Sequence, residues 1–176
     1  LNPLLSNSSI LKIGQNIKFD LHVLKNNGFG PVYPLDDTML MSYTLSAGLH
    51  NHNLDFLAKF YLDHQMTKFK DIVGTGKKEI NFSEVDIEIA KNYACEDADI
   101  TLRLWHALKI NLIQKKLLRV YENIEKPLIN VIVDMEMNGI KIKEDKLNLL
   151  SKSFDSQMHL LQNEIFSITN KEFNIN

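Results

Sequence analysis

The sequence predicts an α/β fold in which a short strand–helix–strand–helix unit is followed by an almost entirely helical remainder. Three observations predict it. Residues 9–13 form a short apolar stretch that Gly14 closes, residues 32–35 form a second extended stretch, and apolar residues recur at helical spacing after residue 83. Because two short strands are too few for a stable sheet, we expect further strands to precede the first one.

A helix is expected after each strand. The apolar positions of residues 17–24 do not settle the period, but the Asn-Asn-Gly run at 26–28 supplies a C-terminal stop and favours a helix. After the second strand, Asp36 or Asp37 can cap a helix that continues to about Leu45. The first half of the chain therefore alternates between the two kinds of element.

The next segments are a helix and a polar loop. Asn53 can cap a helix over residues 54–61, where the apolar side chains form one stripe. Residues 65–78 are polar and rich in lysine, and Gly74 and Gly76 interrupt them. We therefore expect a loop with a short helical turn in this stretch.

The longest helix is predicted to begin with Ser83 followed by Asp86, a pattern typical of a helix N-terminus. Its length follows from side chains that share one face at three- and four-residue steps. These are Ile87, Ala90, Tyr93, Ala94, Asp97, Ile100, Thr101, Leu104 and Leu108.

Two more helices are expected in the last third of the chain. One covers residues 118–138 and is bent by Pro127, and a long amphipathic helix covers 144–169 after a brief extended piece at 140–142. The composition shifts towards basic residues near 115–120. We therefore predict a domain boundary after residue 116.

Composition limits the class of protein. Apolar residues make up 44% of the chain and charged residues 24%, which predicts a folded core rather than disorder. No apolar run approaches the roughly 18 residues of a membrane helix, and no signal peptide is recognisable. Cys95 is the single cysteine, so we expect a reducing cytoplasm. The net charge of −2 argues against a protein that coats nucleic acid.

Two pairs of polar residues are candidates for chemistry. Asn16 and Asp20 follow directly on the first strand, where ligands usually bind in α/β sheets, and their spacing puts them on nearly the same side of a helix. Tyr93 and Asp97 share an otherwise apolar helix face, where a carboxylate is costly to bury without a partner such as a metal ion. A capping Asn with a solvated Asp, and a partly exposed Asp97, remain the plain alternatives.

Taken together, these segments resemble a known family. Residues 12–20 resemble the second exonuclease motif of the bacterial DNA polymerase I family (family A DNA polymerases), and residues 93–99 resemble its third motif, of the tyrosine-containing type. The order and spacing of that family also appear in five further segments: 37–40, 52–58, 69–77, 121–128 and 136–142.

The resemblance implies a ribonuclease H-like 3′→5′ exonuclease domain over residues 1–116 and the helical start of the polymerase thumb over 117–176. The family's first motif, an Asp-x-Glu on the opening strand, would lie before Leu1. The chain would then carry two carboxylates of a four-carboxylate site. On its own, such a fragment is expected to be inactive.

The resemblance also implies a role for each site residue. Asp97 would bind the metal ion that activates water, and Tyr93 would orient that water. Asp20 would serve a second metal ion, and Asn16 would steady the terminal nucleotide. Phe69 would stack near the frayed 3′ end, although a hydrophobic anchor under the loop is as good an interpretation. The ions expected are two Mg²⁺, or Mn²⁺ or Zn²⁺.

The implied partners are DNA as a single-stranded 3′ end or a primer-template, and deoxynucleotides in a monomeric full-length enzyme without membrane attachment. Lys68, Lys70, Lys77 and Lys78 could attract phosphates, although a solvated loop is the simpler interpretation. Two alternatives stay open: an inactive exonuclease-like scaffold, and an RNA-trimming 3′→5′ exonuclease of the same superfamily. The polymerase-like residues 121–142 argue against the RNA enzyme.

Overall fold

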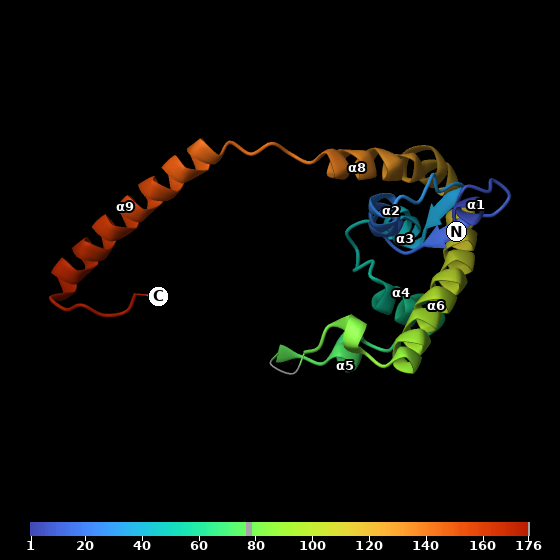
Figure 1. The fold of residues 1–176 in the computed structure, drawn as a ribbon, viewed down its shortest axis with the longest axis horizontal. Coiled ribbons are helices and arrows are strands. Elements are labelled where there is room, and N and C mark those ends of the chain that lie inside the picture. Colours follow the sequence, from blue (N-terminus) through green and yellow to red (C-terminus); the bar gives the residue numbers. More distant parts are fainter. Residues whose placement is uncertain (77–78, 176) are drawn as a thin grey trace. The chain divides into compact units, whose positions relative to one another are not determined.

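The computed structural model describes residues 1–76 and 79–175 (Figure 1). It divides into two compact units, Leu1–Asn138 and Gly139–Asn176. The first unit holds both strands and all residues of the predicted exonuclease motifs, so the site is built there.

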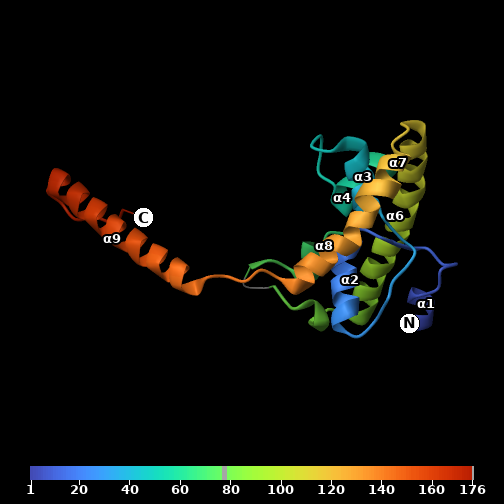
Figure 2. The same ribbon diagram turned by 90° about the horizontal axis from the view of Figure 1, so that it is seen from above.

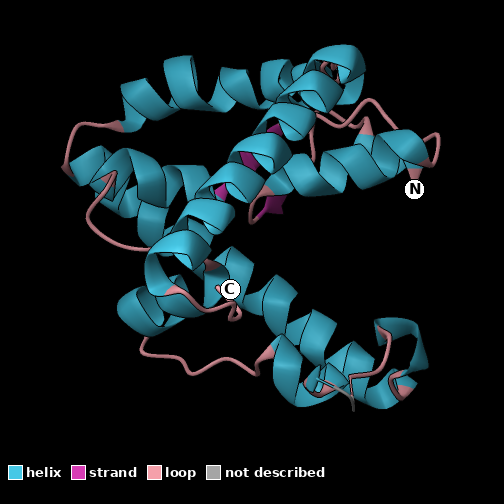
Figure 3. Cartoon of the chain, turned by 90° about the vertical axis from the view of Figure 1, so that its left-hand side faces the viewer, coloured by secondary structure: helices cyan, strands magenta, loops and turns pink. Residues whose placement is uncertain are grey.

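The sheet of the first unit consists of two parallel strands, β1 (Lys12–Gly14) and β2 (Leu35–Asp37). Lys12 pairs with Leu35, and Gly14 pairs with Asp37. All three residues of β2 are buried. Figure 3 shows the strands as a small element among helices, and the described part of the chain contains no further strand.

Both predicted strands exist, but each begins about three residues later than the patterns at 9–13 and 32–35 indicated. Proline explains the shift in the second strand. Pro34 has no N–H to donate to the ladder, and its carbonyl accepts from the backbone N–H of Lys12 at 2.9 Å. Regular pairing can therefore start only at residue 35.

Three helices of the first half follow the predictions closely. They are α2 (Ile17–Asn26), α3 (Thr38–Ser46) and α4 (Leu54–Leu62). Asp37 caps α3, with the N–H of the second helical residue donating to its carboxylate at 2.8 Å. Asn53 caps α4 through a hydrogen bond of 2.9 Å. Side-chain caps that the sequence revealed thus set both helix starts.

Helix α6 (Ile87–Gln114) is the longest element of the first unit. Asp86 caps it by accepting the N–H groups of Glu88 and Ile89. The Ser83 of the predicted start lies in a separate 3₁₀ turn, η2 (Phe82–Glu84). The loop preceding this turn contains the short helix α5 (Phe69–Val73). A helix at the N-terminus, α1 (Asn2–Leu5), was not predicted.

The predicted single helix 118–138 is present as three consecutive segments. These are α7 (Leu118–Val120), the π-helical η3 (Tyr121–Glu125) and α8 (Lys126–Asn138). The π turn ends beside Pro127. Since proline lacks an N–H and its ring crowds the preceding turn, the helix widens there instead of continuing regularly.

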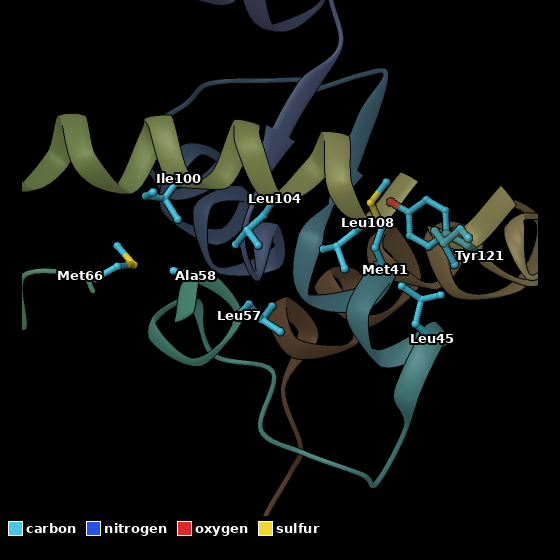
Figure 4. Packing of buried hydrophobic residues seen from close by; sticks show 10 residues of the cluster. Met41, Leu45, Leu57, Ala58, Met66, Ile100, Leu104, Leu108 and Tyr121 are labelled. Atoms are coloured by element: carbon cyan, nitrogen blue, oxygen red, sulfur yellow. The ribbon is translucent and has the colours of Figure 1, made fainter. Parts of the chain in front are cut away.

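Two buried clusters stabilise the first unit. The larger joins α3, α4 and α6, and the aromatic ring of Tyr121 closes one end of it (Figure 4). The smaller joins α2, β2 and α8; its members are Ile17, Leu21, Leu35, Ile129 and Val133. Figures 1 and 2 show α2 and α8 side by side, and these helices also share three ion pairs. Residues after the predicted boundary at 116 thus help to hold α2, while the boundary itself stays a prediction.

The second unit is dominated by α9 (Glu144–Thr169), close to the predicted 144–169. None of its residues is buried, and its apolar stripe is largely exposed, for example Leu147 at 53% and Phe154 at 54%. Phe166 and Phe173 form an edge-on ring contact at 5.8 Å within this unit. Among the described residues, no helix combines the length and hydropathy needed to cross a bilayer.

Candidate active site

Asp20 of α2 and Asp97 of α6 line the same cavity, which has a volume of about 630 Å³. Gly14 and Gln15 line it from the end of β1, and Thr101 lines it one turn after Asp97. The cavity thus opens at the carboxyl end of a parallel strand, the usual place for ligands in an α/β sheet. The fold brings together two carboxylates that are 77 positions apart in the numbering of the chain.

The start of α2 fixes Asp20. Asn16 precedes α2 in a left-handed conformation with φ 58° and ψ 47°. The backbone N–H groups of Asn16 and Ile17 donate to the Asp37 carboxylate at 3.1 and 2.9 Å. The Asn16 side chain is not among those lining the cavity, although its neighbours Gln15 and Ile17 are.

The passage from β1 to α2 leaves no room for a side chain at Gly14. A Cβ there would lie 2.8 Å from Cγ1 and 2.9 Å from Cβ of Ile17. The hydroxyl of Thr38 donates to the Gly14 carbonyl at 3.0 Å and ties this turn to α3. The glycine therefore permits the close approach that brings α2 to the cavity.

Tyr93 lies one turn before Asp97 on α6 but lines a different cavity, together with Glu96. Its ring meets an aromatic pair edge-on, with centroid distances of 6.1 Å to Phe69 and 6.3 Å to Phe82. Phe69 and Phe82 themselves stack at 5.7 Å. Phe82 was missed from the sequence, because nothing in a 3₁₀ turn marks an aromatic residue as part of a site.

Burial is the leading influence on the pKa values of the two carboxylates at the cavity. Burial raises the pKa of Asp97, the negative charges of Glu96 and Asp55 raise it further, and a hydrogen bond from Tyr93 opposes them. Burial also raises the pKa of Asp20, and a hydrogen bond from the backbone N–H of Asp20 partly offsets this rise. Among the described residues, no lysine, arginine or histidine contributes to either shift. Lys12 lines the same cavity, but its ammonium donates to the backbone carbonyls of Asn7 and Ile10.

This donor set fits a hard divalent cation, because carboxylates that are desolvated and lack a basic partner are relieved by a bound metal ion. Within residues 1–76 and 79–175, no three His, Cys, Asp or Glu side chains gather closely enough to hold an ion.

Tyr93 is suited to donate a hydrogen bond. Burial raises the pKa of its phenol first, and the charge of Asp97 together with the hydrogen bond to it raises that pKa further. The hydroxyl therefore keeps its proton at neutral pH. Asp55 contributes negative charge to both Tyr93 and Asp97.

The neighbouring histidines have structural contacts. His52 Nδ1 lies 2.9 Å from the Ser42 hydroxyl, and its carbonyl accepts from Gln15 at 2.8 Å. Of the lysines considered for phosphate binding, Lys68 and Lys70 are exposed beside Phe69, whereas Lys77 and Lys78 lie outside the described residues.

A small parallel sheet among helices, with carboxylates from two elements at one cavity, agrees with the ribonuclease H-like fold that the resemblance implies. A family model described as 3′-5′ exonuclease matches residues 1–113. The chain therefore belongs to the 3′-5′ exonuclease family, of the type found in DNA polymerase I. This confirms the resemblance and the fold class that the sequence predicted.

Similar proteins carry the name DNA polymerase I. That of Rhizobium leguminosarum is 42% identical over 99% of this chain and 17% of its own length, and that of Pseudomonas aeruginosa is 39% identical over 99% and 20%. That of Borreliella burgdorferi is 39% identical over 93% of this chain and 18% of its own. The chain thus spans about a fifth of the length of these relatives.

Two solved structures resemble the fold. The POL domain of Pol1 from M. smegmatis, in complex with DNA primer-template and dNTP, has a TM-score of 0.72 and 22% identity, and the match covers 98% of this chain and 27% of that one. Brucella melitensis NrnC has a TM-score of 0.64 and 23% identity, with coverage of 78% and 63%. At such identities, the likeness shows the fold.

Proposed function

We propose that this chain is the exonuclease and thumb-start segment of a DNA polymerase I that acts in DNA replication and repair. Its site removes mispaired nucleotides by hydrolysing the 3′-terminal phosphodiester. The observation that carries the proposal is the meeting of Asp20 and Asp97 at one cavity, where no described basic residue lowers the pKa of either carboxylate. Domain limits of 1–116 and 117–176 belong to the same proposal.

The metal ions would be two Mg²⁺, or Mn²⁺ or Zn²⁺, held by Asp97, by Asp20 and by further carboxylates of the complete site. When bound, such a pair supplies a hydroxide nucleophile and stabilises the leaving oxygen. Tyr93 donates its hydroxyl hydrogen bond to orient the attacking water. Asn16 steadies the terminal nucleotide, and Phe69 stacks on a base of the frayed end, a contact worth roughly 1–3 kcal/mol.

The substrate is the single-stranded 3′ end of DNA, with a primer-template and deoxynucleotides as partners of the polymerase part. The structure of the M. smegmatis enzyme with DNA primer-template and dNTP supports this partner class. The exposed, unpaired Cys95 supports a reducing, cytoplasmic setting. The enzyme acts as a monomer.

The experiment is a comparison of Asp97→Ala with the unaltered enzyme in the complete polymerase. We expect removal of 3′ nucleotides from single-stranded DNA to be abolished, while nucleotide addition to a primer-template stays nearly unchanged. Equal loss of both activities would make Asp97 a structural residue. Faster trimming of RNA than of DNA by the unaltered enzyme would favour the RNA exonuclease instead.

A further inference from the structure

Asp37 lies at the end of β2 with only 2% of its surface exposed. Both of its carboxylate oxygens accept hydrogen bonds from backbone N–H groups. Oδ1 accepts the N–H groups of Asn16, Met39 and Leu40 at 3.1, 2.8 and 3.4 Å, and Oδ2 accepts the N–H of Ile17 at 2.9 Å. Capping α3 needs only the bonds to Met39 and Leu40. The remaining two bonds reach α2, which begins 20 residues earlier in the chain.

Helix α2 needs this external acceptor. The first N–H groups of any helix have no partner within it, and Asn16 at the N-cap makes no side-chain hydrogen bond to them. The Asp37 carboxylate replaces that cap and places negative charge at the positive end of the helix. Asp20 lies one turn after Asn16, so a change in the first turn of α2 displaces Asp20 relative to Asp97.

The main chain of Asp37 is also held. Its N–H donates to the Tyr121 hydroxyl at 2.9 Å, and that hydroxyl donates to Asp36 at 3.1 Å. Asp36 in turn accepts from Lys126 at 2.8 Å and from Trp105 at 2.7 Å. These contacts tie β2 to α6 and η3, whereas the two hydrogen bonds to the first N–H groups of α2 come from the Asp37 carboxylate itself.

We propose that Asp37 is a positioning residue of the exonuclease site: it fixes the first turn of α2 and thereby the placement of Asp20 opposite Asp97. The inference rests on the proposed function, because it gives Asp37 a role in the same reaction. It assigns no contact between Asp37 and the substrate.

The test is Asp37→Asn in the complete polymerase. Asn is a good helix cap, so it can keep α3 through one oxygen, but its NH₂ group cannot accept the hydrogen bond that the second oxygen took. In either orientation of the amide, at least one N–H of Asn16 or Ile17 loses its acceptor. We expect kcat for removal of 3′ nucleotides to fall about 10- to 100-fold, as is usual for residues that orient ligands.

KM should change by less than about threefold, because DNA binding outside the reacting atoms is untouched. The matched control is Asp36→Asn, the same substitution in a neighbour that is 1% exposed and makes no bond to α2. It should lower the melting temperature but leave kcat within about threefold of the unaltered enzyme. Hydrogen exchange of residues 16–20 should accelerate in Asp37→Asn and not in Asp36→Asn.

The proposal stands if kcat falls and exchange at the start of α2 accelerates, both specifically in Asp37→Asn. It is overturned if kcat is unchanged, if exchange at residues 16–20 is unchanged, or if Asp36→Asn has the same effects. If Asp97→Ala degrades DNA as fast as the unaltered enzyme, the proposed function itself fails. The exchange comparison then still decides whether Asp37 holds α2.

Discussion

At the scale of single residues, the site joins carboxylates whose ionised forms the fold disfavours. Asp20 and Asp97 both have raised pKa values, with burial as the leading cause. Carboxyl groups with raised folded-state pKa values lower the stability of the fold at neutral pH, and such groups are common at functional sites. Substitution of these residues therefore tests whether the site lowers the stability of the fold.

The first prediction concerns Asp97→Asn in the 176-residue chain. When the folded-state pKa of a carboxyl is raised, its contribution to stability is fully present at pH values below the unfolded-state pKa, here 3.8. This contribution is lost as pH rises through the folded-state pKa. The variant should therefore melt higher at pH 7, by up to about 3 °C, and the gain should vanish towards pH 4.

Thermal unfolding monitored by circular dichroism between pH 4 and 8 provides the measurement. Asp99→Asn is the control, because Asp99 lies on the same helix and pairs with Arg103 at 3.4 Å. That variant should show no gain in melting temperature. A lower melting temperature for Asp97→Asn at pH 7 would contradict the raised pKa of Asp97.

Gly14→Ala tests the close passage from β1 to α2. The new methyl group would meet Ile17 at 2.8 Å, so α2 must shift, and we expect a loss of about 1–3 kcal/mol in the free energy of unfolding. Gly139→Ala is no suitable control, since Gly139 has a φ of 67°. Ser8→Ala, at an exposed position, should change stability by less than about 0.5 kcal/mol. Equal stability of Gly14→Ala and the unaltered chain would show that α2 tolerates the shift.

At the scale of elements, the sequence predicted what local patterns encode. The cap Asn53 was visible, as was Asp37 as one of two candidates, because a helix N-terminus depends on residues next to it. The start of α6 was placed at Ser83, three residues before its actual cap Asp86. The dual role of Asp37 was not visible, since its other partners are Asn16 and Ile17. The meeting of Asp20 with Asp97 came from the resemblance, because no local spacing encodes which helices share a cavity.

Other differences between the predicted and the observed elements also arise from contacts or residues that no local pattern reveals. The strands were misplaced by about three residues because Pro34 decides where the ladder begins. The π turn of Tyr121–Glu125 had no pattern of its own, since its residues would also suit an α-helix. The burial of Asp36 depends on Lys126, 90 positions further along. Burial tends to raise the pKa of Asp36, but the hydrogen bonds and charges of its partners outweigh it and lower that pKa.

Tyr121→Phe tests how firmly η3 holds β2. Removal of the hydroxyl leaves the buried N–H of Asp37 without an acceptor and takes one donor from Asp36. We expect a loss of about 1–3 kcal/mol in the free energy of unfolding, measured by urea denaturation. Tyr43→Phe, with Tyr43 45% exposed, should stay within about 0.5 kcal/mol. Similar values for the two variants would mean that the Tyr121 hydroxyl does not hold β2.

At the scale of the whole molecule, the two compact units differ in how well their helices are covered. Helix α6 buries five residues, whereas α9 buries none. Since exchange of backbone amides reports local opening, residues 147–165 should exchange faster than residues 87–104. Hydrogen exchange followed by mass spectrometry measures this. Equal protection of the two helices would show that α9 has found a core of its own.

The number of carboxylates at the cavity also limits the nuclease activity that we expect of the 176-residue chain alone. It supplies two carboxylates to the cavity, and the described residues contain no cluster of three metal ligands. We therefore expect little or no release of nucleotides from labelled single-stranded DNA with Mg²⁺ or Mn²⁺. Trimming from the 3′ end by the pure chain would show that two carboxylates suffice.

The central claim is that Asp20 and Asp97 act on one reaction from one cavity. The most direct measurement is kcat for removal of 3′ nucleotides by the complete polymerase with Asp20→Asn, Asp97→Asn and both substitutions together. Residues of one catalytic unit are strongly non-additive. We predict that each single variant loses most of the activity. The kcat of the double variant should be no lower than that of the less active single variant. Losses that simply multiply, or a single variant with full activity, would contradict a shared site.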